Sequence, residues 1–135
     1  MDKKELKRIT TEKLIFGMLD WNKPSETQAR GIELAVKTNE IRPFLQPITK
    51  LYGKNVWENC AKIISEYDDK KLERYLFELL KWLMDMNWPG AFIILDRINN
   101  FSDKSAVKTA KLNCLLIAKQ TGDEVWTANL EMIKI

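Results

Sequence analysis

The sequence predicts an all-α protein in which antiparallel helical hairpins are stacked as a short α-solenoid of six to eight helices. Apolar residues recur at helical spacing along nearly the whole chain. No segment shows strand alternation bounded by hairpin turns. The segment Met18–Pro24 is echoed by Met84–Pro89, and each lies between two helical runs. Such an echo favours a HEAT-like repeat, in which helical pairs stack on one another.

Composition predicts one domain, residues 1–135, of a cytoplasmic protein. Apolar residues make up 45% of the chain and charged residues 30%, which is ordinary for a globular protein. The net charge of +3 is mild and no basic block stands out, which argues against nucleic acid as a partner. The charged N-terminus lacks the apolar core of a signal peptide, and no apolar run approaches the roughly 20 residues of a membrane span. Cys60 and Cys114 are interpreted as small buried hydrophobic residues.

The first two helices are predicted from apolar stripes and a start signal. The first begins near Lys3 and contains Leu14, Ile15, Met18 and Leu19. Ser25 and Gln28 have capping-box spacing, so a second helix is expected to begin there. Its stripe contains Ala29, Ile32, Ala35 and Val36.

The next region contains two prolines that interrupt the helical pattern. We expect a short helical turn from Pro43, a kink at Pro47 and a stop at Gly53, because both prolines cannot lie inside one regular helix. Asn55 and Glu58 again have capping-box-like spacing. The helix that they open has the stripe Val56, Trp57, Cys60, Ile63, Ile64 and Tyr67.

A helical hairpin with almost no loop is centred on the segment Asp85–Gly90. The stripe before this junction contains Leu72, Tyr75, Leu76, Leu79, Leu80, Leu83 and Met86. Asn87 is expected to cap the second helix, with Pro89 in its first turn. That helix carries Trp88, Ala91, Phe92, Leu95 and Ile98. The residues expected to form the central core are Trp57, Leu76, Leu79, Leu80, Leu83, Phe92 and Leu95.

Two further helices complete the prediction. A long helix follows Ser102 and Asp103 and carries Val107, Ala110, Cys114, Ile117 and Ala118. Gly122 suits a C-terminal cap, and Asp123 is expected to cap the last helix. The apolar residues of the last helix are Val125, Trp126, Leu130 and Ile133.

No arrangement of residues in the sequence predicts catalysis. The chain contains no histidine, the commonest general base and metal ligand. Asp68 and Asp69 precede a helix, where capping and the helix dipole explain them. The five glycines form no phosphate-binding loop. We therefore expect no catalytic residue, no metal site and no cofactor.

Tryptophans at the helix junctions are the candidate partner-binding residues. Most of the five tryptophans are interpreted as core residues, but Trp21 and Trp88 lie at junctions, where an indole can be half exposed. Tryptophan is enriched in binding hot spots. Asp20, Asp85 and Asn87 lie beside them, where they either cap helices or meet a basic partner.

Three segments of the chain resemble a family of small bacterial proteins, mostly from Firmicutes, that carry a domain of unknown function. The segments are residues 18–24, 55–63 and 76–91. The family's LLxWLxDxNWPxA hallmark is matched from Leu79 to Ala91, and the resemblance covers about Met18 to Phe101. It implies an all-helical, HEAT-like fold without catalytic residues. It also implies an immunity role, because similar proteins are encoded near polymorphic toxins.

These observations lead to the expectation of a non-catalytic module that binds and neutralises a cognate toxin domain. The mild positive charge counts against this hypothesis, because many inhibitors of basic nucleases are strongly acidic. Two alternatives stay open: a small enzyme with a Glu or Asp base, and a nucleic-acid-binding helical repeat. The second would use scattered basic residues such as Arg30, Lys37, Lys62 and Lys81. The acidic residues on similar faces would cancel them, namely Glu33, Glu58 and Glu78.

Overall fold

The computed structural model describes residues 1–135 and confirms the all-α class, with no strand. The α-helices are α1 (Lys3–Met18), α2 (Ser25–Lys37), α3 (Gln46–Thr49), α4 (Trp57–Ser65), α5 (Asp69–Leu72), α6 (Leu76–Lys81), α7 (Ala91–Asn99), α8 (Lys104–Gln120) and α9 (Glu124–Leu130). The 3-10 turns are η1 (Arg42–Phe44), η2 (Lys54–Val56), η3 (Glu73–Tyr75) and η4 (Trp82–Met84). Because α5, η3, α6 and η4 form one continuous helical stretch, the chain has eight helices.

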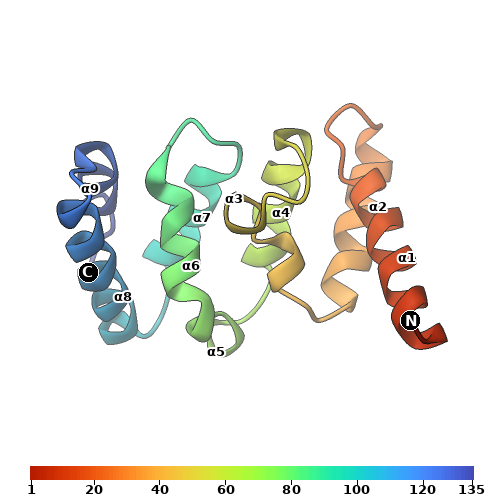
Figure 1. The fold of residues 1–135 in the computed structure, drawn as a ribbon, viewed down its shortest axis with the longest axis horizontal. Helices are drawn as coiled ribbons and strands as arrows, with labels where there is room; N and C mark the ends of the chain where they lie inside the picture. The colour runs from red at the N-terminus through yellow and green to blue at the C-terminus, as the bar shows by residue number, and fades with distance from the viewer.

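The helices form a row of pairs, as predicted (Figure 1). Along the row lie α1 with α2, α3 with α4, α6 with α7, and α8 with α9. Helix α2 packs against α4, α4 against α7, and α6 against α8. Each pair therefore contacts the next pair, which is the packing of a stacked helical array.

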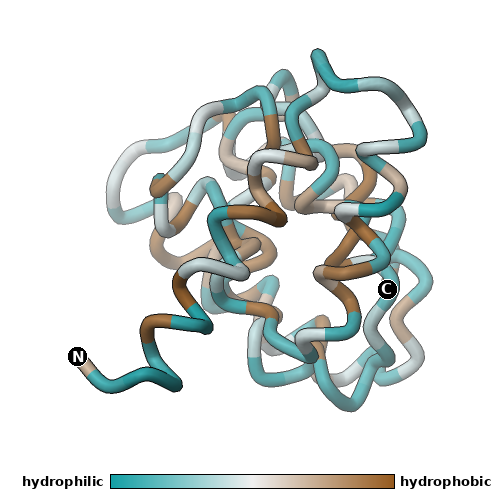
Figure 2. Tube along the Cα trace, turned by 90° about the vertical axis from the view of Figure 1, so that its right-hand side faces the viewer, coloured by the Kyte–Doolittle hydropathy of each residue, from teal (hydrophilic) through white to brown (hydrophobic).

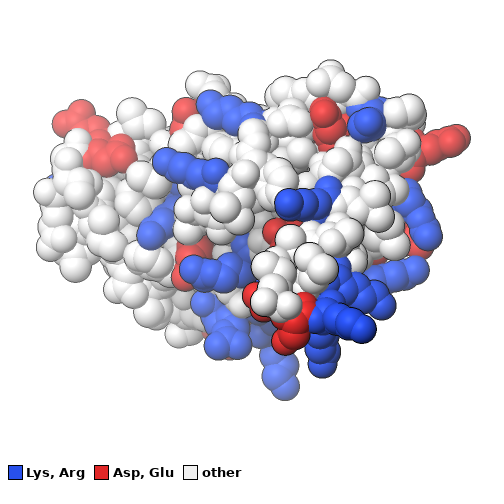
Figure 3. Space-filling view, turned by 45° about the vertical axis from the view of Figure 1, so that its right-hand side comes forward, with Lys and Arg blue, Asp and Glu red and all other residues white.

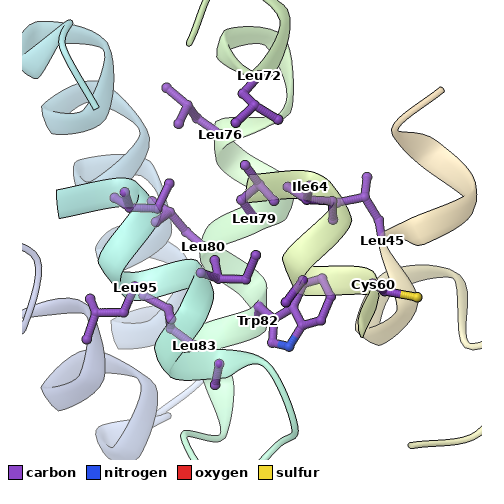
Figure 4. Close-up of a cluster of buried hydrophobic side chains, with 14 of the residues drawn as sticks. Leu45, Cys60, Ile64, Leu72, Leu76, Leu79, Leu80, Trp82, Leu83 and Leu95 are labelled. Carbon is purple, nitrogen blue, oxygen red and sulfur yellow. The ribbon is translucent and has the colours of Figure 1, made fainter. Parts of the chain in front are cut away.

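One hydrophobic cluster of 33 buried residues runs through the row. Apolar stretches of the helices turn inward and the connecting loops are mostly hydrophilic (Figure 2). Leu79, Leu80 and Leu83 lie at the centre, with the Trp82 indole and α4 side chains beside them (Figure 4). Six of the seven residues expected in the central core are buried: Trp57, Leu76, Leu79, Leu80, Leu83 and Leu95.

Phe92 is the exception, because 62% of its surface is exposed. Helix α7 begins at Ala91 and buries Ala91, Ile94, Leu95 and Ile98. This spacing defines the packed face, and Phe92 lies about 100° around the helix from Ala91. The expectation that Phe92 is a core residue was therefore wrong.

Three aspartates cap helices as the sequence indicates. The carboxylates of Asp68, Asp103 and Asp123 accept hydrogen bonds from backbone amides in the first turns of α5, α8 and α9, at 2.9–3.0 Å. Gly122 ends α8 with a φ of 70°, the left-handed conformation that favours glycine. These contacts confirm the predicted ends of the last two helices.

The two capping-box predictions are wrong. Helix α2 begins at Ser25 with Pro24 as N-cap, and no side chain caps it. Helix α4 follows η2 directly and has no side-chain cap either. Ser25 is itself the first residue of α2, and Asn55 lies within η2, which continues into α4, so neither expected capping side chain stands before the first turn.

The region of Pro43 and Pro47 contains the expected short helical turns. The turn η1 includes Pro43, and Pro47 lies in the first turn of α3, where a missing amide hydrogen does no harm. Helix α3 ends at Lys50, which has a φ of 51°, and not at Gly53. The expected stop was therefore placed three residues too late.

Cys60 and Cys114 are free and buried, as predicted. Burial raises the pKa of the Cys114 thiol to about 11 and that of Cys60 still further. Both thiols therefore pack as small apolar groups. None of the helices combines the length and apolar character that a membrane span requires.

Candidate functional site

The sequence-predicted partner residues lie along one edge of the row, the upper edge in Figure 1. Three connections form it: Leu19–Pro24 between α1 and α2, Gly53–Val56 before α4, and Asp85–Gly90 between η4 and α7. The amide of Trp21 donates to the carbonyl of Asn55 at 3.0 Å, which joins the first connection to the second. We call these three connections the junction edge.

Asp20 and Trp21 form the first turn of the junction edge. The amide of Asn22 donates to the Asp20 carboxylate at 2.9 Å and lowers the pKa of that carboxyl. The turn holds the Trp21 side chain outward, with 50% of its surface exposed. Trp21 is therefore accessible to a partner.

The buried Asn59 and the partly buried Gln28 hold this turn from the protein side. Asn59, which is 3% exposed, donates through Nδ2 to the carbonyl of Leu19 at 2.7 Å and to Gln28 Oε1 at 2.9 Å. Gln28 in turn donates through Nε2 to the carbonyls of Lys23 and Trp21, at 2.7 and 3.2 Å. Gln28, which was expected to cap α2, thus holds the turn that carries Trp21. The polar Asn59 within an apolar helical stripe was the sequence signal for this contact.

The turn in the Asp85–Gly90 connection repeats the turn in the Leu19–Pro24 connection. The carboxylate of Asp85 accepts a hydrogen bond from the amide of Asn87 at 2.8 Å, as Asp20 does from Asn22. The structure therefore accounts for the sequence echo between the two junctions: both contain an Asp-x-Asn turn.

Asn87 does not cap α7, contrary to prediction. The helix begins four residues later, at Ala91, and Gly90 occupies the N-cap position with a φ of 89°. Asp85 makes the side-chain bond in this turn, and Asn87 contributes its backbone amide and an exposed side chain. The turn needs these residues between η4 and the helix, so Asn87 lies too early in the chain to reach the free amides of α7.

Trp88 is half-buried against the core. Its ring meets the ring of Trp57 edge to face, with centroids 5.6 Å apart and planes at 87°. The indole of Trp82 donates to the carbonyl of Pro89 at 3.0 Å and holds the next residue of the turn. The Trp88 ring is therefore packed on Trp57, and the backbone that follows it is held by Trp82, before any partner binds.

The five tryptophans differ in how their indole N–H groups are satisfied. Those of Trp57, Trp82 and Trp126 each donate to a backbone carbonyl at 3.0–3.1 Å. Those of Trp21 and Trp88 have no acceptor within the protein, and neither is buried away from water. The two junction tryptophans thus carry a free donor on an apolar ring, a combination suited to a protein interface.

Other residues considered from the sequence take structural roles. Arg30 and Lys37 both pair with Glu33, at 3.3 and 3.2 Å, so one carboxylate offsets part of their charge. Asp69 receives hydrogen bonds from Ser102 in addition to its place in a helix start. No three His, Cys, Asp or Glu side chains form a group that could hold a metal ion.

The fold and this edge define an all-α protein of stacked helical pairs in which two helix junctions each combine an Asp-x-Asn turn with a tryptophan. The chain belongs to the DUF5071 family, a domain of unknown function, whose model matches residues 54–134. The match includes the Asp85–Gly90 turn and extends further towards the C-terminus than the resemblance seen in the sequence. No match was found among curated proteins or among solved structures.

Proposed function

We propose that this protein is a non-catalytic binding module that neutralises a cognate toxin domain by contact through the junction edge. The observation that carries the proposal is the pair of solvent-accessible indole donors at Trp21 and Trp88, neither of which has an acceptor within the protein. A buried tryptophan normally satisfies its N–H, as the other three do here. A tryptophan that presents both its ring and its donor at a surface is suited to contact another protein.

The surroundings of the two tryptophans have the anatomy of a binding hot spot. Trp21 supplies an exposed apolar ring, and Trp88 supplies a ring already packed against Trp57. Asp20 and Asp85 lie beside them as polar contacts, and the exposed Asn87 adds an amide. An apolar anchor ringed by polar groups is common at protein interfaces.

Pre-organisation further supports a binding role. The buried Asn59 and the partly buried Gln28 hold the Asp20–Asn22 turn, and the Trp82 indole holds the Asp85–Gly90 turn. Binding to such turns orders few additional groups, which lowers the entropic cost of association. The edge carries two carboxylates, Asp20 and Asp85, and two lysines, Lys23 and Lys54, so the cognate surface should present charges of both signs to it.

The choice of a toxin as the partner rests on the family resemblance, because similar proteins are encoded near polymorphic toxins. A co-expression experiment tests this choice directly. A toxin-like gene adjacent to the gene for this chain is expressed alone and together with it. We expect arrest of growth by the toxin alone, rescue on co-expression and co-purification of the two proteins. Absence of a complex with any neighbouring gene product, together with turnover of a small substrate that one Asp or Glu substitution abolishes, would overturn the proposal.

Substitutions then test the edge itself. Trp21→Ala and Trp88→Ala should each weaken the complex by at least about 1 kcal/mol, roughly fivefold in Kd, with an unchanged circular dichroism spectrum. Leu116→Ala is the matched control, because Leu116 is an exposed apolar residue of α8 with 59% of its surface accessible. If the control weakens the complex and both tryptophan variants leave it intact, the interface lies on α8 instead.

A further inference from the structure

A groove opens on the edge of the row opposite the junction edge. The N-terminal half of α1, the connection between α2 and η1, and the α5–η3 segment surround it, all at the lower edge in Figure 1. It consists of two adjoining cavities of about 480 and 290 Å³. Both cavities are lined by Arg8, Glu12, Glu40 and Pro43, so they form one continuous depression.

The excess positive charge of the protein is concentrated in this groove. Its lining contains five cations and two carboxylates, namely Lys4, Lys7, Arg8, Arg42, Lys71, Glu12 and Glu40. Removing these from the 22 basic and 19 acidic residues of the chain leaves 17 of each, so the remainder is neutral. Figure 3 shows Lys and Arg gathered along the lower part of this side of the molecule, with few acidic groups between them.

The five cations have no carboxylate partner within the protein. The four ion pairs of the structure involve other basic residues: Arg30, Lys37, Arg97 and Lys111. Lys4, Lys7 and Arg8 lie at i, i+3 and i+4 on α1, and therefore on one face of the helix. The helix thus holds a row of unpaired positive charges along one wall of the groove.

Two acidic residues of the groove, Glu12 and Glu40, favour a peptide over a nucleic acid as its ligand. The carboxylates of Glu12 and Glu40 lie among the cations, and burial together with the nearby Glu40 raises the pKa of Glu12. Carboxylates accept hydrogen bonds, so Glu12 and Glu40 can bind the backbone amides of a peptide, a donor that a phosphodiester backbone lacks.

We propose that this groove binds an extended acidic peptide segment of a partner protein. Asp and Glu side chains of the segment pair with Arg8, Arg42 and the α1 lysines, and its backbone amides donate to Glu12 and Glu40. The guanidinium groups suit carboxylates because they can bind them with two parallel hydrogen bonds. The exposed Leu51, with Tyr75 and Pro43 beside it, offers apolar contact to the peptide. This site lies opposite the junction edge and does not depend on the proposed toxin partner.

Fluorescence anisotropy with a fluorescein-labelled Glu-rich peptide tests the proposal. The comparison probes are a Gln-rich peptide of the same length and single-stranded oligothymidine. We expect the Glu-rich peptide to bind, the Gln-rich peptide not to bind, and oligothymidine to bind more weakly than the Glu-rich peptide. Raising the salt concentration should weaken the complex, because the charges meet at the surface. Tighter binding of oligothymidine would overturn the proposal in favour of a nucleic-acid site.

Matched double variants locate the binding. Arg8→Ala with Arg42→Ala should reduce affinity for the Glu-rich peptide at least about tenfold. Arg30→Ala with Lys37→Ala removes the same charge from α2, outside the groove, and should reduce it less than about twofold. Equal losses in the two variants would show that net charge alone attracts the peptide and would overturn the proposed site.

Discussion

Gly90 and Gly17 differ in whether the structure leaves room for a side chain. Gly90 has a φ of 89°, and an added Cβ would lie 2.7 Å from the Cβ of Ala61 and 3.1 Å from the carbonyl oxygen of Trp57. Gly17 is helical and a Cβ there would meet nothing within 4 Å. The same substitution should therefore have opposite effects at the two positions.

Gly90→Ala should destabilise the protein by about 1–3 kcal/mol, from a strained φ and a close contact with packed atoms. Gly17→Ala should stabilise it by about 0.5–1 kcal/mol, because alanine favours the helix and loses less backbone entropy. Urea denaturation of both variants measures the change in the free energy of unfolding. A neutral result at Gly90 would mean that the turn can move away from α4.

Substitutions of Asp85 and Asn87 test which of these side chains holds the Asp85–Gly90 turn. Asp85→Ala removes the acceptor for the Asn87 amide, and we expect a loss of about 0.5–1.5 kcal/mol. Asn87→Ala removes an exposed side chain without an intramolecular bond, so the free energy of unfolding should change by less than about 0.5 kcal/mol. Urea denaturation at neutral pH distinguishes the two, and a larger loss at Asn87 would restore that residue as the structural group.

At the scale of the helices, the apolar stripes were predictable and several helix ends were not. A stripe such as Leu76, Leu79, Leu80 and Leu83 repeats many times, so one exposed position does not obscure it. An end depends on one or two side chains that have competing partners. Gln28 could cap α2 or tie the Trp21 turn, and the buried Asn59, 31 residues away in sequence, decides for the turn. The spacing of residues in the sequence cannot predict the contact between Gln28 and Asn59.

The same reasoning separates the two candidate surfaces. Trp21 and Trp88 were identifiable because each lies at a junction that is local in the sequence. The groove was not, because its charges come from α1, the α2–η1 connection and the α5–η3 segment. The spacing of Lys4, Lys7 and Arg8 on one helix face was the only local signal. Tertiary packing brings Arg42 and Lys71 into the same cavity lining as Arg8.

One ion-pair cluster ties three helical elements together. The carboxylate of Asp69, at the start of α5, lies 2.6 Å from the guanidinium of Arg97 on α7. The same carboxylate accepts hydrogen bonds from the amide and hydroxyl of Ser102, which precedes α8, at 2.8 and 2.6 Å. These Ser102 bonds, with the contribution of Arg97, lower the pKa of Asp69 to about 2.

This pKa predicts a stability change in acid. The folded pKa lies below the ordinary value of 3.8, so the stabilisation by Asp69 is fully present above about pH 4 and is lost as the pH falls through about 2. Asp69→Asn should be less stable than the wild type at pH 7, and the difference should shrink between pH 4 and pH 2. Urea denaturation across this range measures it. A constant difference over the range would show that the Asp69 charge does not contribute.

At the scale of the whole molecule, contacts between neighbouring pairs hold the row together. Besides the apolar cluster, polar ties join successive pairs: Asn59 of α4 donates to the carbonyl of Leu19, and Asn129 of α9 donates to that of Leu83 at 2.8 Å. In both cases an asparagine of one pair binds the last turn before a junction in the previous pair. The same device thus anchors both Asp-x-Asn turns to the pair that follows.

Such a row should respond most strongly to a defect at its centre. Leu79 of α6 is fully buried, and Leu79→Ala should cost about 2–5 kcal/mol because it removes apolar contacts and leaves a cavity. Pairs in a stacked array depend on their neighbours, so amide hydrogen exchange should quicken in α4 and α7 as well as in α6. The exposed Leu116 provides the control: Leu116→Ala should change stability by less than about 0.5 kcal/mol and leave exchange in those helices as it was. If exchange quickened in α6 and α7 but not in α4, the pairs would unfold as independent units.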